Sequence, residues 1–146
     1  MIGKLSEERK LAAVCGLYCG ACTTYRAYKD KDSQTLQILV RRISRRLGYD
    51  LTVDEIVCEG CLSSKLMPWC KDCEFKKCSA KKDVTWCFEC KEFPCKKLVD
   101  FNHDGVMHHL LVIDNLREMK EMGVDKWLEK ENQIWRCPKC GKRLHW

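Results

Sequence analysis

Two stretches of the chain place hydrophobic residues three and four positions apart, the spacing of one face of an α-helix. The first stretch ends at Gly48 and carries Leu36, Leu39, Val40, Ile43 and Leu47. The second runs from Val106 to Met122, ends at Gly123 and carries Leu110, Ile113, Leu116 and Met119. Glycine commonly follows the last turn of a helix. Both stretches are therefore predicted to be amphipathic helices.

Capping signals predict shorter elements in the N-terminal half. Ser6, followed by two acidic residues, can start a short helix, and a second helix begins near Cys22. Ser33 is the predicted N-cap of the first long helix. Thr52 and Glu55 have the spacing of a capping box.

Two further helices are predicted in the C-terminal half. Pro94 suits the first turn of a helix over residues 95–101. Asp125 can cap a last short helix that bears Trp127 and Leu128. The helical patterns predict a mainly α fold with little β-structure.

Cysteine dominates the region between these helices. The chain has thirteen cysteines, and eight of them lie between residues 58 and 95. Within that region the pattern W-C-x-[D/E]-C-x4-C occurs twice, starting at Trp69 and at Trp86. Loops of eight residues follow Cys61 and Cys78, which leaves no room in this segment for long strands or a conventional hydrophobic core.

The cysteine pattern indicates metal ligands. The N-terminus lacks the apolar core of a secretory signal, so a cytoplasmic location is expected, where structural disulfides are rare. Five C-x2-C pairs, at 19/22, 58/61, 70/73, 87/90 and 137/140, have the spacing of zinc knuckles. We therefore expect two or three zinc ions, with an iron–sulfur cluster as the less favoured alternative. The candidate ligands are Cys15, Cys19, Cys22, Cys58, Cys61, Cys70, Cys73, Cys78, Cys87, Cys90, Cys95, Cys137 and Cys140.

Several ligand sets are compatible with the spacing. The simplest partition is sequential, with residues 58, 61, 70 and 73 in one site and residues 78, 87, 90 and 95 in the other. An interleaved partition is the alternative, and the three N-terminal cysteines could also join core cysteines. A third site could unite the N-terminal cysteines with Cys137 and Cys140. His145, five residues after Cys140, is a further candidate ligand, and a surface position is its other reading.

From Cys15 to Phe101 the order of motifs resembles a known family. C-G-L-x-C-x2-C, C-x-G-C, C-x2-C-x4-C and C-x2-C-x-x-F-P-C follow one another, as in a family of small prokaryotic cysteine-rich proteins of unknown function that are regarded as zinc-binding domains. The resemblance extends to longer relatives, which continue with a helix and a W-x-C-P-x-C-G knuckle, as this chain does from Trp135. The resemblance implies a metal-binding module and no reaction.

Other chemistry finds little support in the sequence. The spacing of Cys15, Cys19 and Cys22 also occurs in radical S-adenosylmethionine enzymes, but the chain has no room for the barrel that such enzymes need. No nucleophile with a base and an orienting group is discernible, and no P-loop or GxGxxG motif occurs. We therefore favour a non-catalytic protein. No run is apolar and long enough to span a bilayer.

Charge adds one candidate surface. The formal net charge is +6, and two four-thiolate zinc sites, each of about −2, would reduce it to about +2. The charge total is therefore weak support for a nucleic-acid partner. A local cluster on the predicted helix before Gly48 is more specific, and consists of Arg41, Arg42, Arg45 and Arg46.

The sequence thus predicts a cysteine-rich zinc-binding module over residues 1–101 and a helical appendage over residues 102–146 that ends in a C-P-x-C-G knuckle. The expected role is that of a structural module with an unknown protein partner. A zinc protein that binds nucleic acid through the four arginines is the alternative, and an iron–sulfur or other metal carrier is the second alternative.

Overall fold

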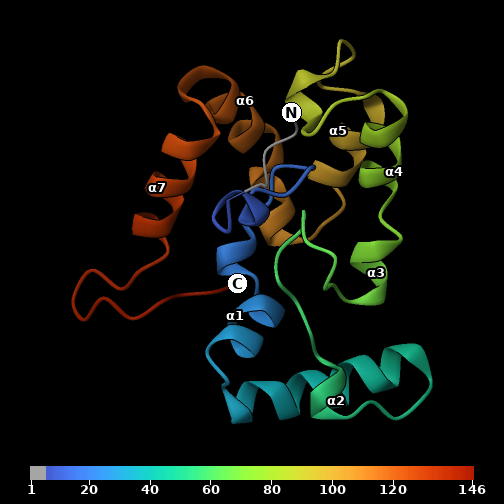
Figure 1. Ribbon diagram of the computed structural model, residues 1–146, viewed down its shortest axis with the longest axis vertical. Coiled ribbons are helices and arrows are strands. Elements are labelled where there is room, and N and C mark those ends of the chain that lie inside the picture. Colours follow the sequence, from blue (N-terminus) through green and yellow to red (C-terminus); the bar gives the residue numbers. More distant parts are fainter. Residues whose placement is uncertain (1–5) are drawn as a thin grey trace.

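The structure, a computed structural model, describes residues 6–146. It consists of helices and connecting loops (Figure 1). In the part of the chain that is described, β-pairing is limited to two isolated antiparallel bridges, Ala12–Tyr18 and Arg136–Arg143. The prediction of a mainly α fold is confirmed. The first five residues of the predicted 1–101 module lie outside the described residues.

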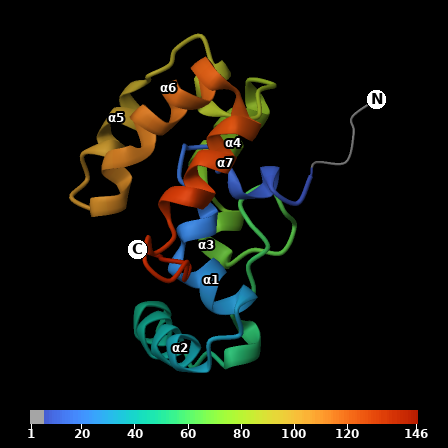
Figure 2. The same cartoon turned by 90° about the vertical axis from the view of Figure 1, so that its left-hand side faces the viewer.

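Short helices follow one another along the whole chain. The α-helices are α1 (Thr23–Lys29), α2 (Ser33–Leu47), α3 (Pro68–Lys71), α4 (Glu74–Lys81), α5 (Lys96–Asn102), α6 (Val112–Met122) and α7 (Val124–Ile134). The 3-10 helices are η1 (Arg9–Leu11), η2 (Cys19–Ala21), η3 (Val53–Glu55), η4 (Cys87–Glu89) and η5 (Met107–Leu111). Figures 1 and 2 show α2 lying crosswise at one end of the molecule, with α6 and α7 towards the other.

The first amphipathic helix forms as predicted, with one correction at its start. Gly48 ends α2 with a φ of 76°. The N-cap is Asp32, whose carboxylate accepts the N–H of Thr35 at 3.2 Å, whereas Ser33 is the first helical residue. A carboxylate at this position also interacts favourably with the helix dipole. The apolar face of α2 forms a small core of its own with Ala27, Leu51, Ile56 and Met67.

The other predicted helix starts are confirmed only in part. The helix after Cys22 is α1, and the capping box of Thr52 and Glu55 is present at η3. Ser6 accepts the N–H of Arg9 at 3.3 Å, but only the 3-10 turn η1 follows. Pro94 precedes α5 by two residues, because Cys95 is the N-cap.

The second amphipathic segment is divided into two elements. Residues Met107–Leu111 form η5, and the regular helix α6 begins only at Val112. Gly123, with a φ of 88°, ends α6 and is also the N-cap residue of α7. Asp125 therefore does not cap α7. It lies in the first turn, and its carboxylate binds the Arg9 guanidinium at 2.8 Å.

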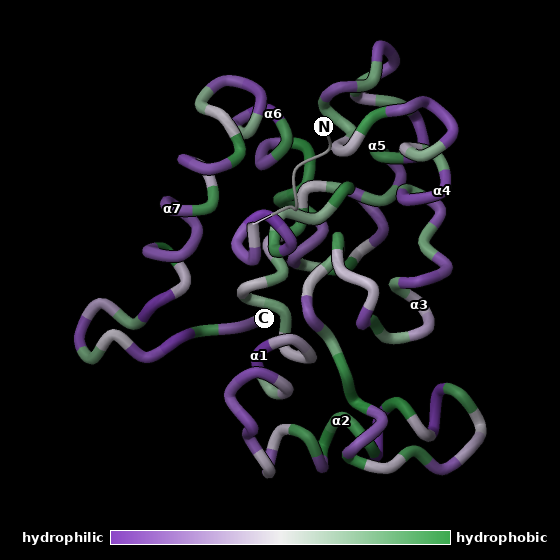
Figure 3. Tube along the Cα trace, viewed as in Figure 1, coloured by the Kyte–Doolittle hydropathy of each residue, from purple (hydrophilic) through white to green (hydrophobic). Residues whose placement is uncertain are grey.

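The main hydrophobic core forms around the N-terminal loop, defined here as residues 12–22. Tyr18 in this loop makes an edge-to-face contact with the fully buried Trp127, with ring centroids 6.0 Å apart. The cysteine-rich segment 58–95 contributes only two buried members to this core, Phe75 and Trp86. Most of the others come from α5, α6 and α7, so the core draws on both sides of the predicted boundary at residue 101. Figure 3 shows apolar positions gathered where the loop meets α6.

Gly16 allows the N-terminal loop to contact α6 directly. Its φ is +96°, and a Cβ at this position would lie 2.5 Å from the carbonyl oxygen of Val112 and 2.8 Å from Cγ of Leu116. The carbonyl oxygen of Gly16 also accepts a hydrogen bond of 2.9 Å from the buried side-chain amide of Asn115. The loop is thereby fixed against the helix by backbone contact that a side chain would prevent.

We predict that Gly16→Ala destabilises the protein by about 2–4 kcal/mol, because left-handed strain adds to overpacking against a backbone atom. Gly48→Ala is the matched control, since Gly48 also has a positive φ but no atom within 4 Å of the added Cβ. The control is expected to cost about 1 kcal/mol. Urea unfolding of the two variants tests this, and equal losses of stability would contradict it.

Candidate metal centre

The N-terminal loop brings distant cysteines together through its backbone. The N–H of Cys87 donates to the carbonyl oxygen of Val14 at 3.0 Å, and the indole N–H of Trp86 donates to that of Ala12 at 3.0 Å. Val14 also makes a backbone hydrogen bond to the sulfur of Cys61. The neighbouring Gly60 packs against Lys10, two residues before the loop, where an added Cβ would lie 2.5 Å from the Lys10 carbonyl oxygen. The loop is therefore flanked by both halves of the cysteine-rich segment.

Four cysteines line a single pocket of about 320 Å³ between α4, η4 and α5. We call them the pocket thiols: Cys78, Cys87, Cys90 and Cys95. Phe75, Phe93 and Leu98 form apolar walls of the same pocket. These four cysteines are the second set of the sequential partition. An apolar wall around four sulfurs is typical of a site that excludes water from a thiolate-bound ion.

Polar groups also contact the pocket thiols. The sulfur of Cys90 accepts a hydrogen bond from the backbone N–H of Glu92 at 3.4 Å and one from the ammonium of Lys82 at 3.5 Å. Lys96 and Lys97 line the pocket as well. N–H donors and cations near sulfur stabilise the thiolate form, which is the form that binds metal.

Burial is the largest cause of a Cys87 pKa raised to about 12, and charge repulsion from the neighbouring Cys95, Cys78 and Cys90 thiols contributes the next largest parts of that rise. Four thiolates cannot share such a pocket without a cation, because each disfavours ionisation of the others. A divalent cation would remove this repulsion, and binding would release the protons.

A second group of cysteines lies between the N-terminal loop and the first part of the cysteine-rich segment. We call its members the N-terminal thiols: Cys19, Cys22, Cys58, Cys61 and Cys70. Burial raises the pKa of Cys70 to about 12, with Cys58 and Cys22 as the next largest causes. These three cysteines also pack with Tyr25 and Leu66 in one hydrophobic cluster. In the structure, therefore, Cys22 lies beside Cys58 and Cys70, which belong to the first set of the sequential partition.

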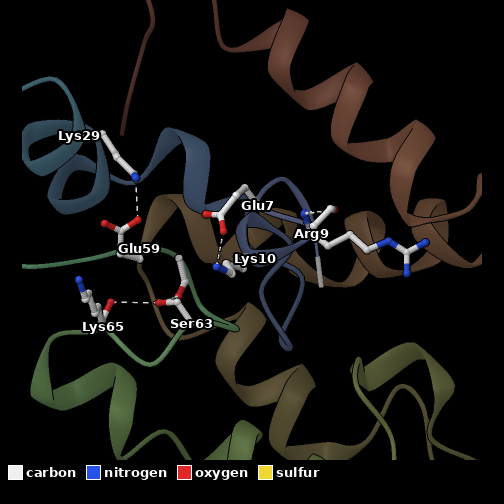
Figure 4. Close-up of polar contacts among 9 residues, drawn as sticks. Glu7, Arg9, Lys10, Lys29, Glu59, Ser63 and Lys65 are labelled. Carbon is white, nitrogen blue, oxygen red and sulfur yellow. Dashed lines mark hydrogen bonds and ion pairs between the residues drawn. The ribbon is translucent and has the colours of Figure 1, made fainter. Parts of the chain in front are cut away.

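An ion pair ties α1 to the loop that carries Cys58 and Cys61. The ammonium of Lys29 contacts the carboxylate of Glu59 at 2.6 Å, and the Tyr28 hydroxyl donates to the same carboxylate at 3.2 Å. Figure 4 shows Lys29 reaching from α1 to Glu59, with Glu7 and Lys10 forming a neighbouring pair. These contacts hold Cys22, at the start of α1, beside Cys58.

The two remaining core cysteines, Cys15 and Cys73, lie between these groups. Burial raises the pKa of Cys15 well above its ordinary value, and charge repulsion from Cys61, Cys73 and Cys87 adds to the rise. All thirteen cysteines are free thiols. Within residues 6–146, no three His, Cys, Asp or Glu side chains are arranged so that they could hold an ion as they stand. An ion would therefore have to draw the sulfurs closer together.

The two C-terminal cysteines form a separate turn, which we call the terminal knuckle (Cys137–Lys142). The N–H of Cys137 donates to the carbonyl oxygen of Lys142, and the N–H of Gly141 donates to that of Cys137, each at 2.8 Å. Hydrogen bonds from the backbone N–H groups of Cys140 and Lys139 lower the pKa of Cys137, as does one from the Cys140 side chain. His145 faces α1, where its Nδ1 lies 3.1 Å from the Thr23 hydroxyl.

The aromatic and histidine residues have distinct environments. Trp86 is buried, whereas Trp69, at the same place in the repeat, is 39% exposed. Nδ1 of His109 contacts the carboxylate of Asp104 at 2.8 Å, and its ring stacks on Phe101. His108 stacks on Trp146 with ring centroids 4.6 Å apart. Spacing in the sequence gives no signal for these contacts.

The four arginines lie exposed on α2. Arg41 and Arg45 line one shallow hollow beside Tyr49, which is itself 53% exposed. Among the described residues, none of the four forms an ion pair. No helix in the described part of the chain is long and apolar enough to cross a membrane.

Comparison with known proteins identifies a family. Residues 11–100, which include both groups of thiols, match the family described as "Protein of unknown function (DUF3795)". Comparison with curated proteins and with solved structures finds no significant match to either. The family match covers well over half of the 146 residues, and the chain therefore belongs to the DUF3795 family.

Proposed function

We propose that this protein is a zinc-stabilised structural module that acts through contacts with another protein. The observation that carries the proposal is the pocket of about 320 Å³ that four cysteines share. Four sulfur donors with no water position left open suit a structural zinc site, whereas a catalytic zinc keeps an open position.

The chemistry of the pocket supports zinc as the ion. Cys78, Cys87, Cys90 and Cys95 would hold it, and zinc would supply the charge that lets all four thiolates coexist there. Lys82, Lys96 and Lys97 bring positive charge to the pocket. Each is also paired with a carboxylate, of Glu92, Asp100 and Glu74 in turn, so they would offset only part of the net charge of about −2 of the complex. Phe75 and Phe93 would keep water from the sulfurs.

We propose a second ion among the N-terminal thiols. Cys22, Cys58 and Cys70 already share one hydrophobic cluster, and Cys61 lies close enough to Cys19 to contribute to the raised pKa of the Cys19 thiol. This group offers five sulfurs, which is enough for one tetrahedral ion. Binding there would join the N-terminal loop to the residues before α4.

We predict that Cys87→Ser lowers the zinc content by one ion per chain and strongly reduces thermal stability. Structural zinc can supply on the order of 10 kcal/mol of folding free energy, which is comparable to the stability of a whole domain. Elemental analysis and thermal unfolding are the measurements, and EDTA is expected to destabilise the wild type in the same way.

Ser79→Ala is the matched control for this variant. Ser79 lines the same pocket and donates to the carbonyl oxygen of Lys76 at 2.9 Å, but it supplies no sulfur. Its zinc content is expected to equal that of the wild type. The proposal fails if wild-type protein purified under reducing conditions contains no zinc, or if Cys87→Ser retains all of it.

One observation favours a second candidate function, the binding of nucleic acid. From Ser33 to Tyr49 the sequence contains no acidic residue, and the four arginines of α2 are exposed and form no ion pair among the described residues. Arginines free of carboxylate partners are available for phosphate, and exposed Tyr49 offers a ring on which a base could stack.

We predict that replacing Arg41, Arg42, Arg45 and Arg46 by Ser weakens RNA binding and flattens its salt dependence. Each lost phosphate contact on single-stranded nucleic acid reduces the slope of log K against log salt by about 0.7. A control variant replaces four exposed lysines on other elements by Ser: Lys71, Lys81, Lys120 and Lys126. Titration at several salt concentrations is the measurement, and equal slopes for both variants would contradict a site on α2.

A further inference from the structure

The terminal knuckle is half of a metal site. Cys137 and Cys140 lie on one turn, and the backbone N–H groups of Lys139 and Cys140 point to the sulfur of Cys137. The bridge between Arg136 and Arg143 closes the hairpin behind this turn. Such a turn presents two sulfurs to one ion, but a tetrahedral zinc site needs four ligands.

The rest of the described chain does not complete this site. Among the cysteines of residues 6–146, only Cys140 contributes a side-chain hydrogen bond to the lowered pKa of Cys137. The other candidate ligand, His145, lies against Thr23 on α1.

The hairpin is held by hydrogen bonds at its base and is exposed to solvent at its tip. At the base, the N–H of Trp146 donates to the carbonyl oxygen of Ala21 at 3.0 Å, and the N–H of Leu144 donates to that of Trp135 at 2.9 Å. The guanidinium of Arg143 holds the side-chain oxygen of Asn132 at 2.8 Å. At the tip, Cys140 is exposed, and Figure 1 shows the hairpin extending to one side of the molecule.

We propose that two copies of this chain share one zinc ion, held by Cys137 and Cys140 of each. Two identical half-sites related by a two-fold axis give four sulfurs around one ion, which is a self-complementary arrangement. Zinc–sulfur bonds of about 2.3 Å require the two turns to meet tip to tip. The exposed Cys140 allows this approach. Exposed apolar side chains at the base of the hairpin, Ile134 (54%) and Leu144 (41%), are available for contact between the two copies.

Charge gives this dimer a distinctive salt dependence. From Trp135 to Trp146 the sequence has four basic side chains and no acidic one, so two hairpins repel each other. The zinc–thiolate group, with a charge of about −2, offsets only part of this repulsion. Added salt screens exposed charges over about 10 Å at 0.1 M, and the dimer should therefore tighten as ionic strength rises.

The test uses the full chain with zinc and a non-thiol reductant, which prevents disulfide-linked dimers. Light scattering after size exclusion should give twice the 17.1 kDa of one chain for the wild type, and the dissociation constant should fall when salt is added. Cys137→Ser/Cys140→Ser should be a monomer and contain half a zinc ion less per chain. His145→Ala should behave as the wild type does.

Three results would overturn the shared site: a wild type that stays monomeric with zinc, a double-serine variant that stays dimeric, or a loss of one whole ion per chain. The last would mean that one chain completes the site by itself. Because the double-serine variant keeps the pocket thiols and the N-terminal thiols, its remaining zinc reports on the proposed core sites separately. Failure of either proposal is thus recognised independently of the other.

Discussion

Hydrogen bonding to the backbone of the N-terminal loop is the constraint on which the arrangement of the other elements depends. A buried backbone group without a partner is costly, so a loop through the centre of a protein must be satisfied by its surroundings. Here the partners come from three distant regions: Trp86 and Cys87, Asn115, and Trp146. Each contact fixes one part of the chain against the same few residues.

The grouping of the cysteines follows from this arrangement of the backbone. Because both Cys87 of η4 and Cys61 make hydrogen bonds to Val14 in this loop, the cysteines of the loop lie beside those of the cysteine-rich segment. Burial and repulsion from neighbouring thiols raise the pKa of Cys87 and of Cys70 to about 12, so these two thiols are protonated without a bound metal ion. The hydrophobic core beside these sulfurs is substantial. The helices α5, α6 and α7 supply many of its buried apolar side chains, of which the cysteine-rich segment has few.

The elements of the fold could largely be read from local patterns, because helical periodicity and caps are properties of neighbouring residues. The errors occur where a competing residue lies one or two positions away. Asp32 takes the capping position expected for Ser33, and Gly123 takes the one expected for Asp125. The grouping of the cysteines depends on contacts between distant segments. Because the C-x2-C pairs share one spacing, the sequence does not show which pair contacts which. Thus the order along the chain predicts the pocket thiols as a set, but it does not predict Cys22 beside Cys58 and Cys70.

The order of the loop and its hydrogen-bond partners along the chain has a consequence for biosynthesis. Residues 12–22 leave the ribosome before the groups that satisfy their backbone, which lie about 70 to 125 positions further along. Contacts of such long range form slowly, and the apolar loop stays exposed until they do. The nascent chain therefore carries an unprotected, thiol-rich segment until these partners have been synthesised, and its native core can assemble only after α6 and α7 have been made.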